Sequence, residues 1–197
     1  MYVDKHWDHT GNPHPYSRAE FYVGAGDEDA KAFKGSVSDR LNIINWKTDP
    51  GSPIASFDHS CDLFGDGSVI IVDAHGHTAG HLNLLVRTGR NEWILLASDG
   101  CHYPSLLSSA AGKADLTFGK YREHWEDGGT PPTHSYYDDV DQSEVHLKRM
   151  RACEMSSDIM VVIAHDELRW KDWFEAGYGV GPDLRNWKAK GYKSLSE

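Results

Sequence analysis

The stretch SVIIVDAHGHTAGH, residues 68–81, decides the fold. It begins with an apolar run over residues 68–73, which predicts a buried strand. It then passes through a glycine-containing turn and ends at His81, so a potential metal ligand follows closely on the strand. Taken alone, His81 is also compatible with a buried histidine that is bonded to backbone. A metal site is therefore indicated only if other apolar runs end in the same way.

Three other segments place histidine or aspartate at the end of an apolar run. The cluster HWDH at residues 6–9 follows a short Tyr-Val stub. Asp99 follows an expected strand over residues 92–97, and His165 follows one over residues 159–164. Singly, Asp99 also suits a helix cap and His165 a solvated surface. Four strand ends with matching ligand chemistry indicate a metal centre assembled from distant segments.

The HWDH cluster packs three potential ligands into four residues. In an extended chain His6 and Asp8 share a face, whereas in a helix His6 and His9 do. The three side chains therefore converge only where a strand turns into a helix. Imidazole and carboxylate groups suit zinc, and neighbours that aim in different directions can serve two ions.

The composition excludes several classes of function. The 197 residues fit one domain, over residues 1–197. A formal net charge of -10, without a basic stripe, argues against a nucleic-acid partner. No apolar run is long enough to span a membrane and residues 1–5 lack the order of a secretory signal, so we expect a cytoplasmic protein without a membrane partner. The 3 widely spaced cysteines favour a reducing compartment.

The remaining pattern mixes strands and helices over one core, which predicts α/β or α+β architecture. The expected strands cover residues 20–23, 68–73, 82–87, 92–97 and 159–164, with the third and fourth forming a hairpin. Asp141 and Glu144 resemble a capping box and predict the start of a helix that continues to about residue 155. The expected loops cover residues 45–59 and 112–137, and a final helix covers residues 168–174.

As an ordered set, these motifs resemble the metallo-β-lactamase-fold hydrolases. The pattern of that superfamily is H-x-H-x-D-H, then G-H-T-x-G-H, then an aspartate after a strand and a histidine after a later strand. The corresponding segments here are HWDHTGN at residues 6–12, GHTAGH at 76–81, SDGCH at 98–102 and AHD at 164–166. Within the superfamily the chain looks most like the acyl-homoserine-lactonase-type branch.

The resemblance implies an αββα sandwich with two zinc ions at one edge of its packed sheets. The ligands that it implies are His6 and His81 for one ion, Asp8, His9 and His165 for the other, and Asp99 as a bridge between both. His77 would contact and orient these ligands without binding an ion itself. His102 or Tyr103 would lie beside the substrate.

Two departures from the family pattern change the expectation. The first motif histidine falls on Asp4, whose carboxylate is a candidate replacement ligand. The strands that precede the motif in the family are missing from the chain, so the expected fold is a shortened form with a truncated N-terminal sheet. Binding of one ion instead of two is therefore an alternative expectation.

The implied activity is hydrolysis of a small-molecule lactone, ester or thioester by a hydroxide held between the ions, with Asp8 or Asp99 moving the proton. Aromatic side chains that either line an acyl pocket or simply pack are Trp7, Tyr103, Trp125 and Tyr136. Cys101 is not expected to be a nucleophile, because no motif places a base beside it. Two alternatives are an oxidoreductase of the same fold with one iron ion and a non-catalytic metal-binding remnant.

Overall fold

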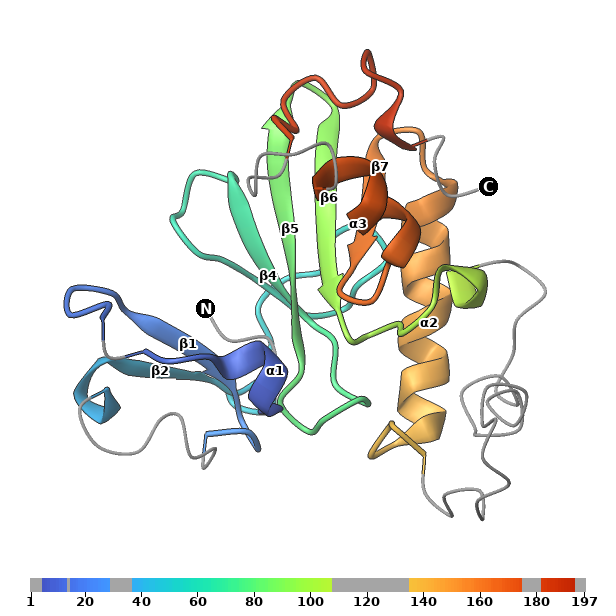
Figure 1. Ribbon diagram of the computed structural model, residues 1–197. Helices are drawn as coiled ribbons and strands as arrows, with labels where there is room; N and C mark the ends of the chain where they lie inside the picture. Colours follow the sequence, from blue (N-terminus) through green and yellow to red (C-terminus); the bar gives the residue numbers. More distant parts are fainter. Residues whose placement is uncertain (1–4, 14, 29–36, 108–134, 175–181, 194–197) are drawn as a thin grey trace.

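The computed structural model describes residues 5–13, 15–28, 37–107, 135–174 and 182–193 (Figure 1). The strands are β1 (Phe21–Gly24), β2 (Leu41–Ile44), β3 (Ser60–Asp62), β4 (Val69–Asp73), β5 (Leu82–Gly89), β6 (Glu92–Ser98) and β7 (Ile159–Ile163). The α-helices are α1 (Trp7–Thr10), α2 (Val140–Met155) and α3 (Glu167–Phe174), and short 3-10 helices cover Ser38–Arg40 and Pro104–Leu107. Within these ranges, no helix combines the length and the apolar character needed to cross a bilayer.

The larger sheet has the strand order β3-β4-β5-β6-β7. Its first four strands run antiparallel, and β7 pairs with β6 in parallel, with Ser98 opposite Ile163. The predicted β5–β6 hairpin is confirmed, and Asn91 in its turn has a left-handed backbone (φ 56°), which asparagine tolerates better than most residues. Because β6 and β7 run in the same direction, Asp99 and His165 leave the sheet at the same edge.

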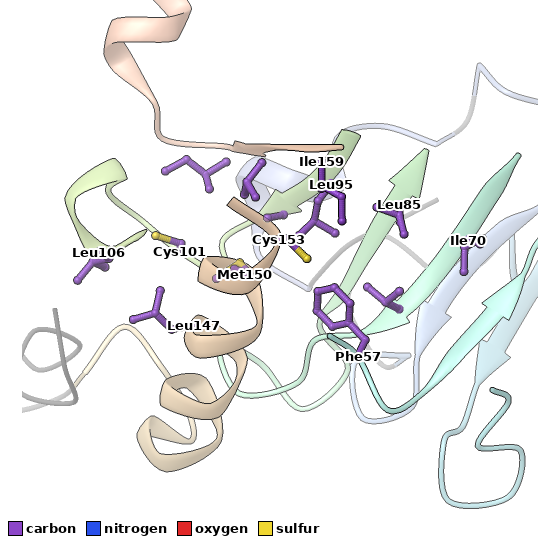
Figure 2. Close-up of a cluster of buried hydrophobic side chains, with 14 of the residues drawn as sticks. Phe57, Ile70, Leu85, Leu95, Cys101, Leu106, Leu147, Met150, Cys153 and Ile159 are labelled. Atoms are coloured by element: carbon purple, nitrogen blue, oxygen red, sulfur yellow. The ribbon is translucent and has the colours of Figure 1, made fainter. Parts of the chain in front are cut away.

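Helix α2 covers one face of this sheet (Figure 1). Figure 2 shows Leu147, Met150 and Cys153 of α2 in the same buried cluster as Leu95 of β6 and Ile159 of β7. The opposite face is covered by the segment that follows α3.

On that opposite face, Met160 of β7 and Ile94 of β6 pack against Trp187, which lies in the segment that follows α3. Because β7 is buried on both faces, its sequence is a continuous apolar run without alternation.

The start of α2 differs from the prediction by two residues. The N-cap is Asp139, whose Oδ1 accepts a hydrogen bond from the backbone N–H of Gln142 at 2.9 Å. The predicted capping box at Asp141 and Glu144 is therefore wrong. The backbone N–H of Asp139 donates to the Gly76 carbonyl oxygen, which ties the cap to the turn before β5.

The smaller sheet consists of β1 and β2 in parallel. The prediction of β1 is confirmed, whereas β2 was not expected, because a segment of four residues with Ile43 and Ile44 adjacent is too short to show a strand period. The sheet is fastened to the turn that precedes β5. A Cβ added to Gly80 would lie 2.3 Å from the carbonyl oxygen of Gly24, so the two backbones are in direct contact. Beside them, the hydroxyl of Thr78 donates to the buried carboxylate of Asp27.

Candidate metal centre

Asp99, directly after β6, is the carboxylate on which the candidate site converges. Its Oδ2 lies 3.1 Å from Nε2 of His9, 3.3 Å from Nε2 of His102 and 3.4 Å from Nε2 of His77. Its Oδ1 lies 3.2 Å from Nε2 of His165. Burial by itself would raise the pKa of Asp99, but hydrogen bonds from His102 and His9 outweigh it and hold the pKa well below its usual range.

The first donor group consists of Asp8, His9, Asp99 and His165. One ligand atom of each lies within 4.8 Å of those of the others. Nδ1 of His9 is 3.3 Å from the hydroxyl of Ser98, which turns Nε2 toward the carboxylates. The group therefore joins α1 to the ends of β6 and β7.

The second donor group consists of His6, His77 and Asp99, again with ligand atoms within 4.8 Å of one another. Nδ1 of His6 lies 3.0 Å from Nε2 of His77. His6 precedes α1 with an extended backbone (φ -69°, ψ 150°), whereas Asp8 and His9 lie within the helix. The HWDH cluster thus lies at a change from extended to helical backbone, and its side chains divide between the two groups.

His81 lies beside these groups and, among the described residues, belongs to neither. Its ring is fully buried, with its centroid 5.5 Å from that of His77. Nδ1 lies 3.2 Å from the carbonyl oxygen of Ala74, so the proton sits on Nδ1 and Nε2 keeps the lone pair that a ligand requires. His81 is therefore oriented as a ligand would be, while His77 lies inside a donor group.

The charge states of the site suit a cation. Burial lowers the pKa of His77 and of His81 to about 3, so both rings are neutral near pH 7, whereas Asp99 is ionised. Neutral imidazoles and ionised carboxylates are the forms that bind a divalent ion. Nitrogen and carboxylate oxygen atoms without a thiolate fit zinc and other borderline cations.

The turn that carries His77 is fixed by its backbone. Gly76 has φ 139°, which side chains of L-residues rarely adopt, and a Cβ there would lie 2.8 Å from the backbone nitrogen of Ser143. The backbone N–H groups of Asp138 and Asp139 donate to the carbonyl oxygens of His77 and Gly76 at 3.0 Å and 2.8 Å. Glycine at position 76 therefore lets α2 approach the turn closely.

The other predicted site residues lie in different surroundings. Tyr103 and Tyr136 are exposed, and the ring of Tyr136 is centred 5.5 Å from that of His102. Cys101 is fully buried, and burial raises the pKa of its thiol to about 12, which disfavours a nucleophilic thiolate. Asp4, Trp125 and the side chain of Trp7 lie outside the described residues.

Two polar pairs beside the site were not predicted. Nδ1 of His102 lies 3.0 Å from the hydroxyl of Tyr137, and Nε2 of His146 lies 2.9 Å from the side-chain amide of Asn83. The partners are separated by 35 and 63 residues in the chain. A single sequence contains no periodicity or motif that connects such positions.

Several curated proteins are similar to this chain in sequence. The cytochrome P450 monooxygenase mpaDE' of Penicillium brevicompactum is 29% identical over 95% of this chain and 24% of its own length. The metallo-hydrolase mfmC of Annulohypoxylon moriforme is 31% identical over 54% of this chain and 32% of its own length. The gamma-lactamase MBL2 of Gibberella moniliformis is 29% identical over 50% of this chain and 47% of its own length. The chain thus spans between about a quarter and a half of these relatives.

Solved structures share the fold at low sequence identity. A variant of B. thuringiensis AiiA with N-decanoyl-L-homoserine at its active site superposes with a TM-score of 0.52 at 16% identity, over 87% of this chain and 56% of that one. An N-acyl homoserine lactone hydrolase with N-hexanoyl-L-homoserine at its catalytic metal centre gives the same TM-score and coverage. No protein-family model matches the chain.

Proposed function

Since the chain has the metallo-β-lactamase fold and resembles its lactonase-type branch, we propose that it is a zinc-dependent hydrolase of a small lactone, ester or thioester. The observation that carries this proposal is the position of Asp99, which is shared by two groups of side chains that could hold a metal ion. A single carboxylate between two such groups is the arrangement that bridges a pair of ions.

His9, His165 and Asp8 are the residues that would hold one ion with Asp99, and His6 with His77 or His81 would hold the other. A divalent ion bound there supplies Lewis acidity, which polarises a carbonyl group and lowers the pKa of water toward neutrality. The chain's own task is to orient the substrate and to move protons.

Asp8 is the residue that we assign to proton transfer. Its side chain is 38% exposed, whereas that of Asp99 is 5% exposed. The imidazoles around Asp99 hold its pKa well below the usual range, which makes it a weak base. Asp8 lies in the same donor group but at the solvent side, where a proton taken from water can be passed to a leaving oxygen.

The exposed rings of Tyr103 and Tyr136 are assigned to the apolar side of the substrate. The assignment of Tyr136 is based on its ring contact with His102, because His102 in turn contacts Asp99. Aromatic side chains that are half-exposed beside a polar site suit an acyl chain, because they offer apolar area without a charged group.

The experiment measures zinc content and hydrolysis of a γ-lactone and a p-nitrophenyl ester by the purified chain. Asp99→Asn is expected to lose at least about 100-fold in rate and His81→Ala at least about 10-fold, since even residues that only support a ligand are worth about 10–100-fold. Asp183→Asn and His59→Ala serve as matched controls outside the site and are expected to keep the wild-type rate. Zinc content of His77→Ala and His81→Ala decides which histidine completes the second donor group.

Two outcomes would contradict the proposal. Equal, near-background rates in wild type and Asp99→Asn would indicate a metal-binding remnant without catalysis. One iron ion per chain, together with oxygen uptake, would indicate an oxidoreductase of the same fold.

A further inference from the structure

His102 differs from the other imidazoles around Asp99. His9, His77 and His165 each belong to one of the donor groups, whereas His102, among the described residues, belongs to neither. Its Nε2 nevertheless lies 3.3 Å from Oδ2 of Asp99, at hydrogen-bonding distance from the bridging carboxylate. An imidazole that holds an ion must point a lone pair at it. His102 is therefore the ring that can give Asp99 an N–H group while its neighbours hold ions.

The surroundings of His102 determine which of its nitrogens carries the proton. Oδ2 of Asp99 only accepts hydrogen bonds, so its contact with Nε2 of His102 is a hydrogen bond only when that nitrogen carries the proton. In a neutral ring, Nδ1 then has a lone pair and needs a donor. The hydroxyl of Tyr137, 3.0 Å away, is that donor. Tyr137 is 4% exposed, and burial raises the pKa of its hydroxyl, so it keeps its proton.

Tyr137 is held in place independently of His102. Its ring belongs to the cluster beneath α2, and its backbone N–H donates to the hydroxyl of Ser135 at 3.1 Å. The next residue, Asp138, donates its backbone N–H to the carbonyl oxygen of His77. The hydroxyl of Tyr137 therefore has a fixed position relative to the turn that carries His77.

We propose that Tyr137 is a positioning residue of the metal centre, which acts by fixing the proton of His102 on Nε2 so that this nitrogen donates to Asp99. The hydrogen bond holds Oδ2, and it keeps Oδ1 directed toward His165. The role presupposes the proposed metal-dependent function, because it matters only if Asp99 bridges two sets of ligands.

The first test observes the proton directly. Two-bond ¹H–¹⁵N correlation spectra of the metal-free chain report the tautomer of each histidine ring, and His102→Gln identifies the signal of His102 by its disappearance. Wild type is expected to show His102 protonated on Nε2 alone, and Tyr137→Phe is expected to show a mixture of both tautomers. A ring protonated on Nδ1 in wild type, or a spectrum unchanged by Tyr137→Phe, would overturn the role of Tyr137.

The second test measures zinc affinity by competition with a chromogenic chelator. Tyr137→Phe is expected to weaken binding by about 10-fold, in the range found for residues that orient metal ligands. Tyr192→Phe removes the same hydroxyl group from the opposite face of the large sheet and is expected to leave the affinity unchanged. In the His102→Gln background, where the glutamine amide can donate to Asp99 without a tyrosine, Tyr137→Phe should change the affinity less than 2-fold.

A loss of the same size in both backgrounds would show that Tyr137 acts through packing instead of through His102. Wild-type protein that binds zinc but hydrolyses neither ester nor lactone would refute the proposed function. In that case the tautomer and affinity results would still decide the role of Tyr137.

Discussion

At the scale of single residues, a buried polar pair connects two strands whose ends carry residues of the candidate metal centre. His146 of α2 is 2% exposed, and its Nε2 donates to the side-chain oxygen of Asn83 in β5. The amide nitrogen of Asn83 in turn donates to the carbonyl oxygens of Ala97 and Leu82 at 3.0 Å and 3.2 Å. Leu82 follows His81 and Ala97 shortly precedes Asp99. The pair thus connects the two strand ends that supply these residues.

Burial of His146 makes the stability of the fold depend on pH. Its pKa is lowered from 6.5 to about 3 in the folded chain. Between these values the unfolded chain binds more protons than the folded one, so the free energy of unfolding falls as the pH is lowered through 6.5. A single group of this kind contributes about 1.4 kcal/mol per pH unit. His77 and His81 shift in the same direction.

The corresponding prediction concerns His146→Gln, which keeps an N–H for Asn83 but does not titrate. The metal-free variant is expected to lose about 1.4 kcal/mol less stability than wild type between pH 7 and pH 5.5. Urea unfolding at the two pH values measures this difference. His59→Gln, outside the buried pair, should retain the wild-type dependence. An unchanged slope in His146→Gln would show that His146 is already charged in the folded chain.

The sequence was informative about which side chains gather at the candidate metal centre and less so about how they are arranged. Histidine and aspartate after apolar runs predicted the approach of His9, Asp99 and His165, because strand ends can be located from local pattern. Whether His77 or His81 faces His6 depends on the backbone conformation of the turn between them. Glycine residues in this turn allow several conformations, so the sequence alone does not determine which histidine it is.

At the scale of elements, the turn before β5 is closely confined by its neighbours. A Cβ on Gly80 would lie 2.3 Å from the carbonyl oxygen of Gly24 and 2.9 Å from Cβ of Asp27. The hydrogen bond from Thr78 to Asp27 links the same two segments beside this contact. Gly65 is different, because it has φ 71° but no atom within 4 Å of an added Cβ.

Gly80→Ala is therefore expected to destabilise the fold by about 2–3 kcal/mol through overpacking. Gly65→Ala should cost only about 1 kcal/mol, through backbone strain. Chemical denaturation of the two metal-free variants checks the difference, and zinc affinity should fall in Gly80→Ala alone. Similar losses in both variants would mean that the contact between Gly24 and Gly80 is loose in solution.

Elements with a clear apolar period were predictable, and short ones were not. The β5–β6 hairpin, β4, β7 and most of α2 follow from local pattern and turn residues. By contrast, β2 and β3 can be recognised as strands only from their pairing with β1 and β4. Ser60–Asp62 pairs with β4 over three residues, which is too short for a period to be recognised.

At the scale of the whole molecule, the candidate metal centre joins parts of the chain that are far apart. His6, Asp8 and His9 come from the beginning of the chain, while Asp99, His165 and the histidines of the turn before β5 lie at the ends of strands of the large sheet. Ser98 and His9, which are in contact, are 89 residues apart. An ion that is bound by both parts can be held only in the folded state, so binding must stabilise the fold.

Removal of zinc with a chelator is therefore expected to lower the melting temperature. At free zinc of 100 times Kd the stabilisation is about 2.7 kcal/mol, which corresponds to about 5–10 °C for a chain of this size. Differential scanning calorimetry with zinc and with excess chelator measures the shift. Asp99→Asn should show little shift, and an equal melting temperature of wild type under both conditions would argue against a site formed by both parts.

The helix α1 has a consequence for the affinity of the centre. It is a single turn without a side-chain cap, and so short a helix has almost no stability of its own in water. Its order is maintained by long-range contacts such as those of His6 with His77 and of His9 with Asp99. Part of the free energy of ion binding is therefore used to organise this turn. The observed affinity equals the intrinsic affinity multiplied by the fraction of molecules in which the turn is already formed.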